Sequence, residues 1–239
     1  MNSAPQDVTV VLVHGAWADG SCWRNVILPL RRENVKTIAA QLPLQSLPSD
    51  IEVLRRILKR TTGPVVLAGH AYAGAVISAT REDRVKALVY VAALTPDEGE
   101  SVADVFYRTD PHPKAPRLSP DAHGFLWMPE EGFVNAVGHR ASTEDLAILA
   151  AVQRPIALEC IQAPAPAPDW RSKPSWYLLA EEDRMIPPET QRFLADRMGA
   201  HTRSCKTDHS PMLSSPNLVV EMILDAVCEA GMRGMTAKS

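Results

Sequence analysis

The sequence is poor in the residues that build covalently or metal-stabilised scaffolds. Only four of its 239 residues are cysteines, they are scattered along the chain, and none forms a C-x-x-C pair. This pattern argues against a disulfide framework and against a zinc site. We expect free thiols in a cytoplasmic protein; the four are Cys22, Cys160, Cys205 and Cys228.

Long apolar runs and clusters of positive charge are missing as well. No apolar stretch reaches the roughly 18 residues that span a bilayer, and the polar start, residues 1–7, lacks the basic and apolar regions of a signal peptide. A net charge of −3 without a run of lysines and arginines provides no field for nucleic acid or an anionic membrane. G-x-G-x-x-G, P-loop and H-E-x-x-H motifs are absent too. We therefore predict no cofactor, no metal, no nucleic-acid partner and no membrane; the sequence says nothing of the oligomeric state.

Short apolar runs alternate with amphipathic segments along most of the chain. The expected strands are 8–13, 35–39, 65–68, 85–92, 175–180 and 202–205, and the expected helices are 21–33, 50–60, 74–80, 143–153, 189–198 and 217–230. Asp50 is the predicted N-cap of the second helix. Continuous apolar strands separated by helices indicate an α/β fold, a mostly parallel sheet flanked by helices. Ligands of such sheets bind at the carboxyl ends of the strands.

One long segment, residues 94–174, breaks this alternation. It is rich in proline and aromatic residues and lies between two predicted core strands. We predict a cap inserted over the strand ends, with an irregular surface excursion as the alternative. The predicted core then comprises residues 1–93 and 175–230, and residues 231–239 form a flexible tail.

The residue that would carry the chemistry is missing from its expected position. Residues 65–75 read VVLAGHAYAGA, a strand, a tight turn and a helix of small residues. This is the frame of the nucleophile elbow, G-x-S-x-G. Ala71 fills the serine position, and Ala73 stands in place of the last glycine, which follows at Gly74. The turn that presents a serine hydroxyl is kept while the hydroxyl is absent.

An acid and a base follow in the order that this fold requires, nucleophile, acid, histidine. Asp183 comes directly after the strand 175–180, with Glu182 as the runner-up, and His209 follows the strand 202–205. Both therefore emerge at the carboxyl edge of the predicted sheet. Histidine can take a proton from a nucleophile near neutral pH because its pKa lies in that range.

Two backbone N–H groups complete the predicted site. Those of Ala16 and Tyr72 are the expected oxyanion donors, because Ala16 follows the first strand and Tyr72 follows the nucleophile position. A set of large apolar residues either lines the substrate pocket or packs the cap, and the sequence leaves both roles open. The set is Trp17, Phe125, Trp127 and Met128.

The chain resembles the α/β-hydrolase superfamily, and more closely the small bacterial esterase-like hydrolases related to plant methylesterases and hydroxynitrile lyases. The matching segments are VLVHGAW at 11–17 with Trp23, GHAYAG at 69–74, LVYVAA at 88–93, EDRMIP at 182–187 and DH at 208–209. The resemblance implies the α/β-hydrolase fold, with Asp183 and His209 as the triad acid and base of a serine hydrolase. The lyase branch typically has threonine and lysine where this chain has Gly15 and Ser210, which favours ester hydrolysis.

Three hypotheses follow for the function. The first is a serine hydrolase of small carboxylic esters or lactones whose nucleophile has been deliberately replaced by Ala71, so that this chain is inactive. The second is a non-catalytic protein that binds a ligand on the same fold. The third is a lyase or another enzyme that uses His209 as a general base without a serine.

Overall fold

The computed structural model describes residues 7–236. Six strands form one sheet in the order β2-β1-β3-β4-β7-β8, and every neighbouring pair is parallel. The strands are β1 Thr9–Val13, β2 Lys36–Ala40, β3 Val65–His70, β4 Val85–Val91, β7 Ser175–Ala180 and β8 His201–Cys205. The central strands β1, β3 and β7 are buried along their whole length, whereas the edge strand β8 is largely exposed. The parallel sheet predicted from continuous apolar runs is confirmed.

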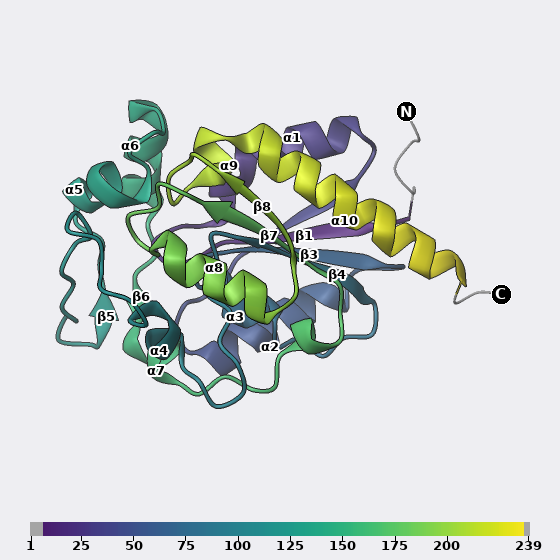
Figure 1. The fold of residues 1–239 in the computed structure, drawn as a ribbon, viewed down its shortest axis with the longest axis horizontal. Coiled ribbons are helices and arrows are strands. Elements are labelled where there is room, and N and C mark those ends of the chain that lie inside the picture. The colour runs from purple at the N-terminus through teal and green to yellow at the C-terminus, as the bar shows by residue number, and fades with distance from the viewer. Residues whose placement is uncertain (1–6, 237–239) are drawn as a thin grey trace.

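Helices cover both faces of this sheet (Figure 1). α1 (Arg24–Arg32) and α10 (Pro216–Thr236) pack on one face, and α2 (Leu47–Leu58), α3 (Ala73–Ile77) and α8 (Pro188–Arg197) on the other. The chain leaves β1 toward β2 and then returns to pair β3 on the other side of β1. Such a reversal of strand order opens a crevice at the carboxyl ends of the strands.

Most of the segment between β4 and β7, from α4 to α7, lies at one end of the molecule, away from the end of α10, and its last part returns along the core (Figure 1). It is built of short elements. They are α4 Val102–Phe106, β5 Phe125–Leu126, α5 Glu130–Gly132, the π-helix η2 Phe133–Val137, α6 Thr143–Val152, β6 Ile156–Ala157, α7 Leu158–Gln162 and the 3₁₀-helix η3 Asp169–Arg171. β5 and β6 pair antiparallel as a small separate sheet. The core adds two further short elements, the 3₁₀-helix η1 Gly20–Trp23 and the helix α9 Pro211–Ser214.

Two details of the predicted elements are wrong. Ser46, not Asp50, is the N-cap of α2, because the Ser46 hydroxyl accepts a hydrogen bond from the Ser49 N–H at 3.3 Å. Asp50 lies inside the helix and is fully buried. The predicted flexible tail also begins too early, since α10 continues through residues 231–236. A helix interior tolerates glycine at a cost of about 1 kcal/mol, so Gly231 does not end it; residues 237–239 lie outside the described part.

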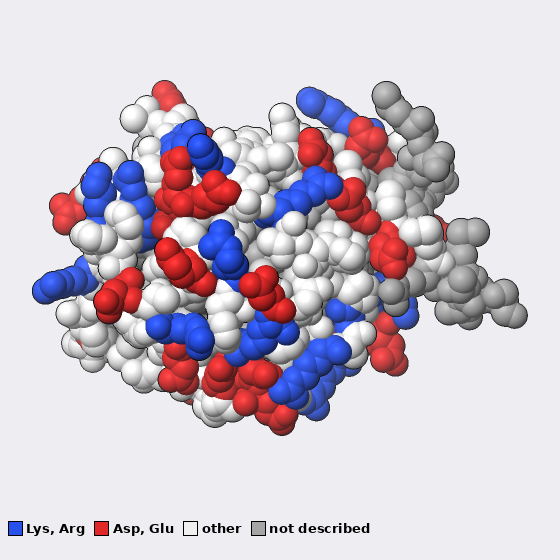
Figure 2. Space-filling view, viewed as in Figure 1, with Lys and Arg blue, Asp and Glu red and all other residues white. Residues whose placement is uncertain are grey.

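The surface carries charges of both signs. On the face seen in Figure 2, lysine and arginine side chains lie among aspartate and glutamate side chains, with no area of a single sign dominating. Within the described residues, no helix combines the length and the apolar character needed to cross a membrane.

Candidate active site

The carboxyl ends of β1 and β3 are neighbours, and this brings two turns together. Val13 pairs with Gly69, so the loop after β1 lies against the turn after β3. A Cβ atom on Gly15 would lie 3.0 Å from the Cβ of Ala71 and 2.9 Å from the carbonyl oxygen of His70. Only a residue without a side chain permits this close approach.

Ala71 occupies the sharp turn between β3 and α3. Its φ is +49°, a region that residues with a side chain rarely adopt. Its carbonyl oxygen accepts hydrogen bonds from the N–H groups of Gly74 and Leu94, both at 3.0 Å, which hold the turn in place. A left-handed conformation costs roughly 1–2 kcal/mol. The strained geometry of an elbow is therefore present, and it presents a methyl group.

The predicted acid and base lie in direct contact. His209 Nδ1–H donates to Asp183 Oδ2 at 2.8 Å, and both side chains are buried. Asp183 also accepts hydrogen bonds from the N–H groups of Met185 and Ile186 and from the side-chain amide of Gln191, at 2.7, 2.9 and 2.8 Å. These donors fix the carboxylate, and the carboxylate fixes the imidazole. With Nδ1 committed to Asp183, the lone pair of His209 is on Nε2, which has no hydrogen-bond partner among the described residues.

Two backbone N–H groups near Ala71 are also free. Neither the N–H of Ala16 nor that of Tyr72 donates to another described residue. The loop that carries Ala16 is held by Trp17, whose backbone N–H donates to the carbonyl oxygen of Arg154 at 3.1 Å and whose Nε1–H donates to that of Leu126 at 2.9 Å. Unpaired N–H groups on a rigid turn are suited to stabilise a developing oxyanion.

Two further histidines support the turns and remain uncharged. His70 Nε2–H donates to the carbonyl oxygen of His209 at 2.7 Å, and burial holds the pKa of His70 well below its usual value. His14 Nδ1–H donates to the Gly15 carbonyl oxygen at 2.8 Å, and its Nε2 accepts from the N–H of Leu42 at 2.9 Å. Burial lowers the pKa of His14 to about 4. Both rings therefore act as neutral hydrogen-bonding struts near pH 7.

A buried carboxyl group ties the elbow to the inserted segment. Asp50 Oδ2 accepts from the Tyr72 hydroxyl at 2.8 Å and from the Cys160 thiol at 3.7 Å, while Oδ1 accepts from the Leu44 N–H at 2.9 Å. Burial raises the pKa of Asp50, although these donors oppose the shift. Through Tyr72, this network braces the residue whose N–H is one of the two free donors.

A small cavity opens where these groups meet. Its volume is about 30 Å³, on the scale where one water molecule needs about 10–15 Å³. Ala16, Trp17, Ala18, Cys22, His70, Ala71, Phe133, Val137, Leu149, His209, Ser210, Met212 and Leu213 line it. The lining contains no lysine, arginine, aspartate or glutamate. It therefore suits a neutral ligand with an apolar surface.

Of the four predicted pocket residues, only Trp17 lines this cavity. Trp127 is 51% exposed and its Nε1–H donates to Asp121 Oδ2 at 3.1 Å, so the ring is held on the surface. Met128 is buried, but within the inserted segment, where its sulfur lies beside Gly132. Phe125 belongs to β5 and pairs Ala157. The pocket prediction is thus corrected for these three, since the π-helix η2 and α6 supply the apolar wall instead.

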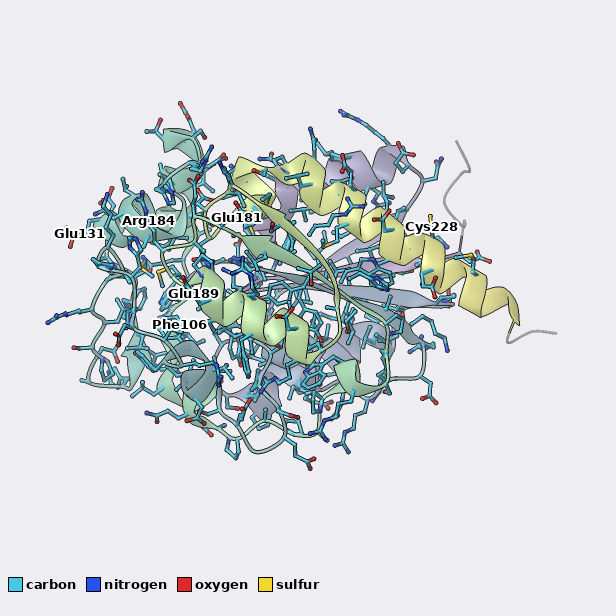
Figure 3. The ribbon with its side chains drawn as sticks, in the orientation of Figure 1. Phe106, Glu131, Glu181, Arg184, Glu189 and Cys228 are labelled. Atoms are coloured by element: carbon cyan, nitrogen blue, oxygen red, sulfur yellow. The ribbon has the colours of Figure 1, made fainter. Side chains whose placement is uncertain are left out.

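The inserted segment is joined to the two loops that carry Asp183 and His209. The Arg140 N–H donates to Asp208 Oδ2 at 2.7 Å, and its guanidinium donates to Glu182 Oε2 at 2.6 Å. Arg184 reaches the same segment from the loop after β7, where its guanidinium donates to the Asn135 carbonyl oxygen at 2.9 Å (Figure 3). Each contact involves a residue directly beside the acid or the base.

A larger hollow of about 550 Å³ lies elsewhere, between β8 and α10. Its lining includes His201, the first residue of β8, so it lies toward the amino end of that strand. Arg203 in this hollow is already paired with Glu221 and Asp225. The small cavity is therefore the better candidate, because ligands of parallel sheets bind at the carboxyl ends. Among the described residues, no cluster of three or more His, Cys, Asp or Glu side chains is placed to hold a metal ion.

Several supporting residues were not predicted from the sequence. Gln191 braces Asp183 from eight residues along the chain, and nothing in its local pattern marks it. Asp50 carried a signal, a carboxylate in an apolar helix face, but was assigned to a helix cap. Arg140 lies in the irregular part of the inserted segment, where the pattern predicts no contact.

Known proteins resemble this chain along most of its length. The model of the Alpha/beta hydrolase family matches residues 10–222. The alpha/beta hydrolase nvfD of Aspergillus novofumigatus (strain IBT 16806) is 26% identical over 255 residues, which cover 92% of this chain and 97% of that protein. The carbendazim hydrolyzing esterase of Nocardioides sp. (strain SG-4G) is 30% identical over 107 residues, 38% of this chain and 44% of that protein.

Solved structures share the fold. Polyneuridine aldehyde esterase superposes with a TM-score of 0.76 at 21% identity, covering 92% of this chain and 99% of that one. A pyrethroid hydrolase from Sphingobium faniae JZ-2 superposes with a TM-score of 0.79 at 21% identity, covering 92% and 97%. These superpositions extend over more than nine-tenths of this chain, whose core is the six-stranded parallel sheet.

Proposed function

Because this chain belongs to the Alpha/beta hydrolase family, we propose that its cavity is the substrate site of a carboxylic ester hydrolase in which Ala71 fills the nucleophile position. The observation that carries the proposal is the Asp183–His209 pair, at 2.8 Å, opening onto the same cavity as the strained turn at Ala71. The relatives named above as esterases or hydrolases act on small organic molecules, which supports the same class of substrate here.

The chemistry of this site with a serine at position 71 would be acyl transfer. The hydroxyl would attack the ester carbonyl while His209 Nε2 takes its proton, and Asp183 would stabilise the imidazolium. The N–H groups of Ala16 and Tyr72 would hold the oxyanion. Water would then release the acyl group by the same steps in reverse order.

Ala71 removes this acyl-enzyme route. Loss of the nucleophile of a triad lowers turnover by roughly 10⁶. The substrate we propose is a small ester or lactone with a neutral, largely apolar acyl group, because the cavity lining contains no lysine, arginine, aspartate or glutamate. No metal or cofactor is required for this reaction.

The test is to compare this chain with its Ala71→Ser variant on short-chain p-nitrophenyl esters. We expect the variant to gain several orders of magnitude in kcat/KM and to be labelled covalently by a fluorophosphonate. Ala18→Ser is the matched control, because Ala18 lines the same cavity outside the elbow. It should neither gain activity nor be labelled.

An Ala71→Ser variant that stays unlabelled and inert over a broad ester panel would contradict the proposal. Ligand binding without chemistry, the second hypothesis, would then explain the retained cavity better. Restoring glycine in the same variant, Ala71→Ser with Ala73→Gly, tests whether the altered turn itself is at fault, because this change returns the elbow to the G-x-S-x-G pattern.

A further inference from the structure

Four polar groups around the cavity are left without partners in the described part of the chain. Two are donors, the N–H groups of Ala16 and Tyr72. The other two are His209 Nε2 and the hydroxyl of Ser210, a residue that is only 2% exposed and lines the cavity. His209 Nε2 and the Ser210 hydroxyl are not sealed inside the protein but belong to residues that line the cavity. Polar groups that face a small cavity are commonly bridged by ordered water, so four of them around one cavity call for an explanation.

The cavity has the size and the polar groups that ordered water requires. Its volume of about 30 Å³ accommodates about two water molecules. A buried water typically makes two to four hydrogen bonds, and the four free groups supply both donors and acceptors. An alanine is smaller than a serine by one hydroxyl group. Ala71 and His209 both line the cavity, so a water in it can take the place of this hydroxyl.

His209 is equipped to activate such a water. Its Nδ1–H is held by Asp183, and its Nε2 lone pair is free to accept a proton. Ser210 is the next residue, and its backbone is fixed by the N–H donated to Asp208 Oδ1 at 3.0 Å. Ser210 lines the same cavity as His209, so its hydroxyl can give a cavity water a second hydrogen bond.

The backbone conformation of the elbow indicates that the site still has a function. Ala71 keeps a φ of +49° although it has no nucleophile to present. Backbone strain of this kind persists where the surrounding structure holds it and is commonly found at functional sites. What the strained turn still presents is the N–H of Tyr72, braced through Asp50.

We propose that this chain, as it stands, hydrolyses activated esters by direct attack of a cavity water. His209 Nε2 takes one proton from the water as its oxygen forms a bond to the carbonyl carbon, and the oxyanion is held by the N–H groups of Ala16 and Tyr72. The tetrahedral intermediate collapses as the ester C–O bond breaks, and the imidazolium returns its proton to the leaving oxygen. One ester and one water give one acid and one alcohol, without an acyl-enzyme.

The substrate class follows from the lining. No acidic side chain other than the imidazolium is available to protonate a leaving alkoxide. Esters of acidic alcohols, such as aryl and enol esters, depend least on this single proton donor and are therefore the compounds that this route should cleave fastest. The inference rests on the proposed ester site, but it does not require the serine that the proposed function restores.

The test measures hydrolysis of p-nitrophenyl acetate by the unaltered chain and by His209→Gln. We expect the unaltered chain to exceed the buffer rate by roughly 10³–10⁴, the range left to a triad enzyme without its nucleophile. Of this, His209 as general base should supply about 100-fold, which His209→Gln removes, and the oxyanion donors should supply the rest. Catalysis by the oxyanion donors alone would not depend on the imidazole. An equal rate in His209→Gln, or no rate above buffer in the unaltered chain, overturns the proposal.

Folding and contamination are controlled in the same experiment. The Asp183 carboxylate keeps its donors from Met185, Ile186 and Gln191, so His209→Gln should retain the melting temperature of the parent within a few degrees. If that variant fails to fold, Ser210→Ala replaces it, with an expected loss of about tenfold. A fluorophosphonate should leave the activity of the unaltered chain untouched; inhibition would show a contaminating serine esterase and overturn the proposal.

The two proposals fail in distinguishable ways. If Ala71→Ser is active and labelled while the unaltered chain shows no His209-dependent rate, the esterase site stands and the water route fails. Pre-steady-state kinetics sharpen this comparison. Ala71→Ser should release p-nitrophenol in a burst as the acyl-enzyme accumulates, whereas the unaltered chain should release it without one. A burst from the unaltered chain would contradict the water route.

Discussion

The two walls of the cavity are built differently. The core wall comes from the loops after β1, β3 and β8 and from α9, and its two imidazoles are held by the buried hydrogen bonds Asp183–His209 and His70–His209. The opposite wall comes from the inserted segment and presents only apolar side chains: Phe133, Val137 and Leu149. The two walls therefore have different roles: the strand ends position the reacting groups, and the inserted helices limit which ligands reach them.

The walls are joined by contacts of a third kind. Arg140 and Arg184 connect the two walls through polar contacts, and the Arg140 side chain, which pairs with Glu182, is 46% exposed while Arg184 is half-buried. Exposed ion pairs contribute little, typically 0–1 kcal/mol. The core wall should therefore be rigid, and the inserted wall should be the one that yields when a ligand larger than two waters enters. The four predictions below test this contrast.

The largest effect is expected on the core wall. In the Ala71→Ser background, Asp183→Asn should lower kcat by about 10⁴, because an amide favours the wrong tautomer of His209. Glu182→Gln is the matched control, since Glu182 lies next to Asp183 and pairs with the exposed Arg140 instead. Its kcat should stay within about threefold of the parent on the same ester. A comparable loss in both variants would mean that Asp183 has no special role.

On the inserted wall, Phe133→Ala should affect stability and size selection rather than chemistry. Phe133 is 1% exposed, and removing a buried phenyl ring costs about 3–5 kcal/mol. The cavity would grow, so KM for bulkier acyl chains should fall in the Ala71→Ser background while kcat for acetate changes little. Urea unfolding and a series of acyl lengths measure the two effects. A large loss of kcat on acetate would show that this wall also positions the reacting groups.

A smaller effect concerns the response of the core wall to acid. The folded protein keeps His14 neutral down to about pH 4, whereas the unfolded chain protonates near pH 6.5. Between these values the unfolded state binds more protons, so stability falls as the pH falls. His14 alone should account for about 2 kcal/mol of unfolding free energy lost between pH 7 and pH 5. His70 contributes in the same direction.

His14→Gln isolates this contribution. A glutamine side chain can both donate to Gly15 and accept from Leu42, as His14 does, but it does not titrate. Urea unfolding of both proteins at pH 7 and pH 5 should show a smaller acid-induced loss in the variant. Equal losses would mean that His14 is not the residue that resists protonation.

The smallest effect is expected for Trp127→Ala. The ring is half exposed and lies outside the cavity lining, so activity in the Ala71→Ser background should change by less than about twofold. Trp17→Phe is the variant to compare with it, because Trp17 lines the cavity and the phenylalanine ring cannot donate the hydrogen bond to Leu126. Losing this hydrogen bond, which holds the loop that carries Ala16, should lower the activity about tenfold. If Trp127→Ala is the more damaging variant, substrate contacts extend beyond the cavity described above.

Prediction from the sequence worked where the pattern is local. The strand β7 was predicted at its observed bounds, and β1, β3 and β4 differ by one or two residues, because buried parallel strands are short continuous apolar runs. The residues at the ends of those strands, Asp183 and His209, follow from the same pattern, since parallel strands end at one edge. That these two side chains meet at 2.8 Å is a fact of the three-dimensional structure.

The sequence predicted that residues 94–174 are an insertion, but it did not predict which residues the insertion contacts. Aromatic residues were assigned to the pocket by type, yet the side chain of Trp127 is bonded to its neighbour Asp121 and stays outside. The apolar wall comes from a π-helix that no periodicity in the sequence marks. Short helices joined by prolines have little periodic signal, so their packing depends on contacts with distant residues such as Asp208 and Glu182.

The sequence by itself determined the order of strands and helices, the identity of Ala71 at the turn, and the absence of the G-x-G-x-x-G, P-loop and H-E-x-x-H motifs. These depend on apolar runs, glycine positions and residue identity, all of which are local. Only the tertiary structure decided which groups lack partners, how small the cavity is, and which residues brace the acid and the elbow. Those properties depend on distances between residues as far apart as Asp50 and Cys160, which are fixed by packing of the whole chain and are not encoded in any single segment.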